Sequence, residues 1–169
     1  GAPNNDENGV NNRGHVRVYE YEMASGTGTG TGTETGTWTK LGGDIDGEAE
    51  YDYSGTSVSL SSDGRIVAIG ANWNDGNGAI SGHVCVYQYQ ESSGTGTGTW
   101  TQLGGDIDGD AGYDESGYSV SLSSDGKIVA IGALYNDGSS TNISDNRGHV
   151  RVYGYQESSG TGTGTWTQL

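Results

Sequence analysis

Pairs of acidic residues recur along the chain in the short motif GDIDG. Asp44 and Asp46 form one pair, and Asp106 and Asp108 form the other. Two neighbouring carboxyl groups are what glycoside hydrolysis requires, one as general acid and one as base or nucleophile. The pairs recur without a differentiated member, however, whereas this catalysis needs two carboxyls in unlike environments. We therefore predict no catalytic residue and a chain that is not an enzyme, with a hydrolase as the least favoured alternative.

Binding of Ca²⁺ is the second chemistry that these carboxylates could perform. Calcium takes six to eight oxygen ligands, and each GDIDG motif supplies only two carboxylates. The same four residues are therefore weak candidates for metal ligands, and we predict no cofactor.

Further acids gather in the loops around these motifs. The chain has 22 Asp and Glu against 7 Lys and Arg, a net charge of −15, which repels the phosphate backbone of nucleic acids. The acids predict a binding face for glycans or matrix proteins, with a solvated and mutually repelling surface as the alternative. The predicted face consists of Asp44, Asp46, Glu48, Asp52, Asp75, Asp106, Asp108, Asp110, Asp114 and Asp137.

Histidine and cysteine are the remaining residues that could bind a metal. Three equivalent GHV motifs contain His15, His83 and His149. Stacked sheets lie roughly 10 Å apart, so we expect each histidine to make a structural hydrogen bond rather than to share one ion. Cys85 stands where two other motifs have arginine, which predicts a partly exposed thiol. An interchain disulfide is the alternative to a thiol without a role.

Alternating Thr and Gly residues occupy three tracts, at 27–37, 95–99 and 161–165. This composition is typical of flexible hairpin loops. Alternatively, in a secreted protein, the tracts are rows of threonine residues that carry O-linked glycans. A sequon for N-glycosylation begins at Asn142. The predicted glycosylation residues are Asn142, Thr27, Thr29, Thr31, Thr33, Thr95, Thr97, Thr161 and Thr163.

The elements that must position these residues are repeated. Residues 42–69 return at 104–131 with an offset of 62 residues, so we divide the chain into a partial unit at 1–41, which holds the last two strands of a repeat, and two complete repeats at 42–103 and 104–169. Within the first complete repeat, segments 57–61, 65–71, 83–88 and 100–103 have the composition of strands. The first two are joined by Asp63-Gly64, a strong hairpin signal.

This pattern predicts an all-β fold. With 33 glycines, no Phe and 30% hydrophobic residues, a large helical core is excluded, because glycine destabilises helix interiors. Four antiparallel strands in each repeat indicate the blades of a β-propeller. The chain holds about 2.6 repeats, which predicts an incomplete propeller or an open array of such blades.

The repeats resemble the FG-GAP or integrin-α-like propeller family, in the version found in secreted and surface proteins of marine algae and bacteria. The matching residues are the SVSLSSDG and IVAIGA segments, the GHV-x-VY motif and WTQLGGDIDG, although the FG pair has become Ser-Gly at 54–55 and 116–117. The family's calcium loop is absent, because the hairpins at 61–64 and 123–126 read only SSDG. The family's calcium site is therefore not carried over.

The resemblance implies an extracellular or cell-surface protein for adhesion, recognition or structural support. The alternative is a building block of an extracellular fibre or appendage, with attached glycans. Neighbouring blades or copies of the chain are the expected partners. No segment has the 18 apolar residues of a membrane span.

Overall fold

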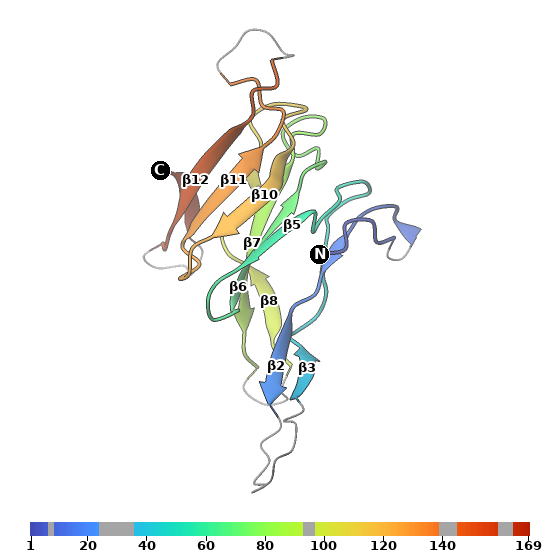
Figure 1. Cartoon of the computed structure of the whole chain (residues 1–169), viewed down its shortest axis with the longest axis vertical. Coiled ribbons are helices and arrows are strands. Elements are labelled where there is room, and N and C mark those ends of the chain that lie inside the picture. The colour runs from blue at the N-terminus through green and yellow to red at the C-terminus, as the bar shows by residue number, and fades with distance from the viewer. Residues whose placement is uncertain (7–8, 24–35, 93–96, 139–144, 159–163) are drawn as a thin grey trace, which may run out of the picture.

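A computed structural model describes residues 1–6, 9–23, 36–92, 97–138, 145–158 and 164–169 (Figure 1). Of these residues, 48% are in β-strands, and no helix forms among them. The described part of the chain therefore has no helix long and apolar enough to cross a membrane. The strands are β1 (His15–Val16), β2 (Tyr19–Met23), β3 (Gly36–Lys40), β4 (Ile45–Asp46), β5 (Ser57–Leu60), β6 (Ile66–Ala71), β7 (His83–Gln90), β8 (Thr99–Gln102), β9 (Ile107–Asp108), β10 (Ser116–Leu122), β11 (Ile128–Ala133), β12 (His149–Gln156) and β13 (Thr165–Gln168).

The strands form antiparallel blades, as the sequence predicts. The central blade has the order β5-β6-β7-β8, the third blade has the order β10-β11-β12-β13, and the first blade consists of the pairs β1-β4 and β2-β3. The fold is thus all-β, with sheets that correspond to incomplete propeller blades. In the part of the chain that the structure describes, these sheets do not close into a barrel.

The first and central blades are each completed by a short strand from the next repeat. Strand β7 pairs with β8 through Tyr87–Gln90, and its first two residues pair with β9. Strand β4 pairs with β1 in the same way, since His15 opposes Asp46. The GDIDG motif, which opens a repeat in the sequence, therefore belongs in space to the sheet of the preceding repeat.

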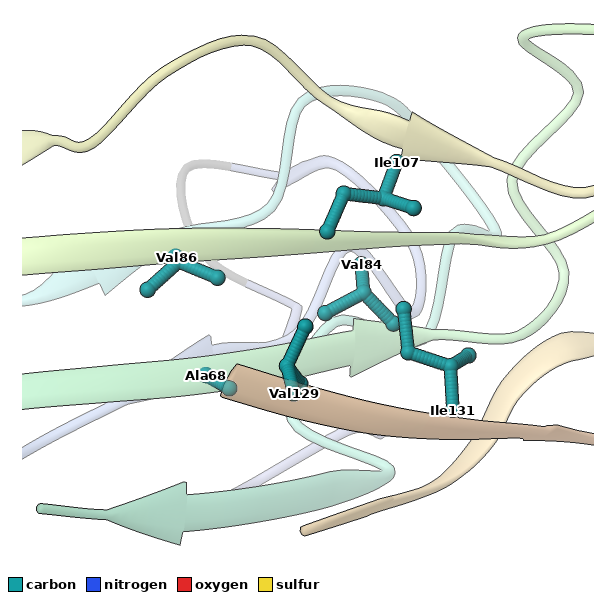
Figure 2. Close-up of a cluster of buried hydrophobic side chains, with 6 residues drawn as sticks. All are labelled: Ala68, Val84, Val86, Ile107, Val129 and Ile131. Carbon is teal, nitrogen blue, oxygen red and sulfur yellow. The ribbon is translucent and has the colours of Figure 1, made fainter. Parts of the chain in front are cut away.

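Two equivalent hydrophobic clusters lie between the blades. Between the central and third blades, the cluster contains Ala68, Val84, Val86, Ile107, Val129 and Ile131 (Figure 2). Between the first and central blades, the cluster contains Val16, Val18, Ile45, Val67 and Ile69. Strand β6 thus contributes to both clusters, Ala68 to one and Val67 and Ile69 to the other, which explains why IVAIGA is apolar at consecutive positions.

The hairpin between β5 and β6 is fixed by side chains. The Ser61 hydroxyl donates to Asp63 Oδ1 at 2.6 Å, and the Arg65 amide donates to the same oxygen at 3.0 Å. Ser123 and Asp125 repeat this arrangement in the third blade. These hydrogen bonds lower the pKa of both carboxyl groups. The two aspartates are turn residues, as the sequence predicts.

A tryptophan links each of the last two blades to its predecessor. Trp100 Nε1 donates to the Leu41 carbonyl at 2.8 Å, and Trp166 Nε1 donates to the Leu103 carbonyl at 2.7 Å. Trp100 also packs against Tyr89, with ring centroids 5.2 Å apart. The WT-(K/Q)-L motif thus carries a contact between blades.

Candidate functional site at the histidine and carboxylate edge

Each acidic pair lies at the short strand that completes the first or the central blade. Asp44 and Asp106 come just before that strand, and Asp46 and Asp108 lie within it. Because β4 lies beside β1, one ligand atom each from His15, Asp44 and Asp46 lies within 4.8 Å of the other two. Because β9 lies beside β7, the same spacing holds for His83, Cys85 and Asp106. The structure therefore brings each buried histidine to the carboxylates of the following repeat, a meeting of residues that the sequence analysis did not predict.

At the first edge, Asp44 is engaged by two cations. Arg17 donates to Asp44 at 2.7 Å, and Lys40 donates to it at 2.6 Å. The hydrogen bonds from Arg17 and then Lys40 hold the pKa of Asp44 well below its usual range. A general acid of a glycosidase needs a raised pKa, so Asp44 is unsuited to that role.

At the second edge, both cations are replaced. Cys85 occupies the position of Arg17 and Gln102 that of Lys40. The Cys85 thiol donates to Asp106 Oδ1 at 3.1 Å, and its Sγ lies 3.7 Å from His83 Nε2.

Two expectations about histidine and cysteine are corrected. Cys85 is only 4% exposed and its sulfur contacts His83 and Asp106, so the expected partly exposed thiol is wrong. The expected structural hydrogen bond is missing at Nδ1 of His15, which is buried and has no partner. His149 is half-buried.

Two acids of the predicted binding face are buried, which corrects that part of the prediction. Asp52 is 3% exposed and accepts hydrogen bonds from the Ala49 amide at 2.8 Å and from Asn74 Nδ2 at 3.1 Å. Asp114 is 4% exposed and makes the equivalent bonds to Ala111 and Asn136. A buried carboxylate needs such donors, so these residues hold loops together and are not open to a ligand.

The loops that carry these aspartates have an unusual backbone. Tyr51 and Tyr113, which precede the buried aspartates, have φ of 66° and 67°, a region that side chains other than Asn and Asp seldom adopt. The amides of Tyr51 and Tyr113 donate to Asn11 and Ala79 in the neighbouring loops. The conformation is held by contacts across blades, which the local sequence does not reveal.

The other acids of the predicted face lie on the surface. Asp110 pairs with Arg151, and Asp75 and Asp137 accept loop amides at 2.7 and 2.8 Å. The exposed acids are Asp46, Glu48, Asp75, Asp106, Asp108 and Asp110.

The predicted glycosylation residues are outside the described residues, except for one. Thr97 is described and exposed. The others, which lie outside, are Asn142, Thr27, Thr29, Thr31, Thr33, Thr95, Thr161 and Thr163.

Glycines of the Ser-Gly and Gly-Ala motifs meet between blades. Gly117 has a φ of 85°, and a Cβ atom at Gly70 would overlap the Gly117 carbonyl oxygen. Neither position accepts a side chain without moving the backbone of the neighbouring blade. The glycines of these motifs therefore permit close packing of blades.

Comparison with known proteins agrees with these motifs. Residues 45–87 match the family model of the FG-GAP repeat. The matched segment begins at β4, includes β5 and β6, and ends within β7. No curated protein matches the chain.

Proposed function

Because the chain is an FG-GAP-like repeat protein, we propose that it is a non-catalytic extracellular protein that gives structural support through blades packed side by side. FG-GAP repeats are typically extracellular. Beyond this location, we assign the protein a structural role, which the packing of neighbouring blades against one another performs.

The observation that supports this role is the exposed face of the third blade. Val84 and Val86 of the central blade are both 0% exposed, because the third blade covers them. The equivalent Val150 and Val152 are 66% and 37% exposed, and Leu169 is 72% exposed. We call these three residues the open blade face. The equivalents of its two valines are buried against the next blade in both hydrophobic clusters, as Val16 and Val18 and as Val84 and Val86.

A further repeat of the same type is therefore the occupant that this face fits. The test is to extend the chain after Leu169 with a second copy of residues 104–169 and to measure unfolding by urea. The expected result is one cooperative transition with a higher midpoint, because stability in repeat arrays includes a term for each interface between neighbours. The slope of the transition should also rise with the surface buried.

The variant that tests this contact carries Val150→Glu in the extended chain, and Met23→Glu is its matched control. A buried, unpaired charge opposes packing, so this variant should unfold in two transitions, with the added repeat less stable. Met23→Glu, at an exposed position of the first blade, should leave the single transition intact. An added repeat that raises neither midpoint nor slope would contradict the proposal.

The absence of catalysis is part of the same proposal. Asp44 is held as a carboxylate by Arg17 and Lys40, and Asp52 and Asp114 are enclosed by their own loops. These acids thus have partners that explain them without a substrate.

Recognition through the exposed acids is the second candidate function. Asp46, Glu48 and Asp108 stay exposed on neighbouring blades and could meet a cation-bridged glycan or a basic matrix protein. The test is binding of an acidic polysaccharide in the presence and absence of Ca²⁺. Binding should require the cation and weaken in Asp46→Asn/Asp108→Asn, and equal retention of the variant and the original chain would oppose recognition.

Two more specific hypotheses belong to the structural role: that the protein builds an extracellular fibre, and that it carries glycans. A fibre would follow if blade packing continued without closing into a ring. Electron microscopy of the native protein distinguishes rings from fibres, and mass spectrometry of the same material detects sugars on the Thr-Gly tracts.

A further inference from the structure

Three different metal ligands meet at one edge of the central blade. Cys85 Sγ lies 3.7 Å from His83 Nε2 and 3.1 Å from Asp106 Oδ1. In tetrahedral zinc sites, bonds of about 2.3 Å to sulfur and about 2.0–2.1 Å to nitrogen or oxygen place neighbouring ligands about 3.5 Å apart. These two separations lie on either side of that value, and the ligand atoms of His83 and Asp106 lie within 4.8 Å of each other. One ion therefore fits among the three atoms after small side-chain movements.

The backbone fixes the three side chains in place. His83 and Cys85 are two residues apart on β7, so they project to the same side of the strand. Pairing of Val84 with Ile107 holds the chain beside them, and Asp106 immediately precedes that pair. His83 and Cys85 are each only 4% exposed, whereas Asp106 is exposed. The site is therefore rigid on two sides and open to water on the third.

The surroundings of the thiol are acidic. Burial raises the pKa of Cys85, and the carboxylates of Asp106 and Glu48 raise it further. The protonated thiol donates its hydrogen to Asp106. A bound divalent cation would replace that proton, because the thiolate is the form that binds metals.

The equivalent edge of the first blade, where β4 pairs with β1, has arginine in place of the cysteine and a different charge around its aspartate. There Arg17 and Lys40 place two positive charges on Asp44, which disfavours a cation beside His15. In the next repeat, Cys85 and Gln102 remove both charges and add a sulfur ligand. The two edges differ in the residues that decide whether a metal is attracted.

We propose that His83, Cys85 and Asp106 bind one thiophilic divalent cation of the zinc type, with water as the fourth ligand. The ion joins β7 to the segment that leads into β9. Imidazole and thiolate together favour zinc over calcium, which prefers oxygen ligands only.

The test uses the full chain after reduction and treatment with a chelator. Titration with Co²⁺ alone should give one equivalent of binding, with the near-ultraviolet absorption of a cobalt–thiolate bond and the visible bands of tetrahedral cobalt. Added Zn²⁺ should then remove both signals by displacing the cobalt. Absence of the thiolate absorption in the original chain would overturn the proposal without need of any variant.

The matched variant is Cys85→Arg, which gives the central blade the residue found at the equivalent positions 17 and 151. It should fold, as judged by circular dichroism, and should bind Zn²⁺ at least about tenfold more weakly, the lower end of the losses seen when a metal site is disturbed. His83→Gln should weaken binding similarly, and His149→Gln should leave it unchanged. Equal affinity in Cys85→Arg and the original chain would assign the metal to other residues and overturn the proposal.

Discussion

At the scale of single residues, the partners of each carboxylate decide its role. Asp44, Asp52 and Asp106 come from loops of similar sequence, yet one is paired with two cations, one is buried against amides, and one accepts a hydrogen bond from a thiol. The difference arises because each reaches side chains far away in the sequence. Equivalent acids therefore do not always have the same role, since Asp44 and Asp106 differ in their partners whereas Asp52 and Asp114 do not.

Removal of the Asp44 charge should change the dependence of stability on pH. The pKa of folded Asp44 lies below its unfolded value, near 3.9, so its ion pairs stabilise the fold above that pH and the contribution is lost as the pH falls below it. Asp44→Asn should therefore lower the free energy of unfolding by about 0.5–1 kcal/mol at pH 7.

The measurement is urea unfolding of both proteins between pH 7 and pH 3. The difference between them should shrink as the pH drops below about 4. Lys40→Gln, which removes one of the two partners, should show a smaller loss. A difference that stays constant over the whole range would mean that the ion pairs do not stabilise the fold.

At the scale of strands, the sequence predicts the four main strands of the central blade but not β9, the short strand that pairs with β7. The predicted segments 57–61, 65–71, 83–88 and 100–103 match β5 to β8 within two residues, because alternating residues and turn motifs act locally. The sequence does not predict the short strand Ile107–Asp108, since its partners in β7, Val84 and His83, lie 23 and 25 residues earlier. The sequence does not predict the burial of Cys85 for a related reason, because the contact of its sulfur with Asp106 joins residues 21 positions apart.

The tryptophan contacts between blades offer a test at this scale. Trp100→Phe removes the donor to the Leu41 carbonyl and should lower the free energy of unfolding by about 1–3 kcal/mol, the cost of a carbonyl left without its partner. Trp38 is 68% exposed, so Trp38→Phe should cost less than about 0.5 kcal/mol. Thermal or urea unfolding measures both, and equal losses would show that Trp100 acts only through its contact with Tyr89.

At the scale of the whole molecule, the blades differ in how much of their surface is covered. The central blade contributes to both hydrophobic clusters, whereas β2 is exposed along its length and the third blade carries the open blade face. Stability in such an array follows the number of neighbours that each unit has.

Hydrogen exchange should reveal this gradient. The amides of β6 and β7 should exchange most slowly, those of β11 at an intermediate rate, and those of β2 and β3 fastest, because exposed units open locally at little free-energy cost. Mass spectrometry of peptides from the native protein measures these rates. Identical protection in all blades would mean that the chain opens only as one unit.

The pairing of β9 with β7 also bears on how such a gene can change in length. Each complete repeat supplies the closing strand of the blade before it, so the first and central blades depend on the joint between repeats rather than on one repeat alone. In-frame duplication or loss of one repeat recreates an equivalent joint when the breakpoints fall at equivalent positions of two repeats. Unequal recombination can therefore alter the number of blades while each joint between repeats keeps its closing strand.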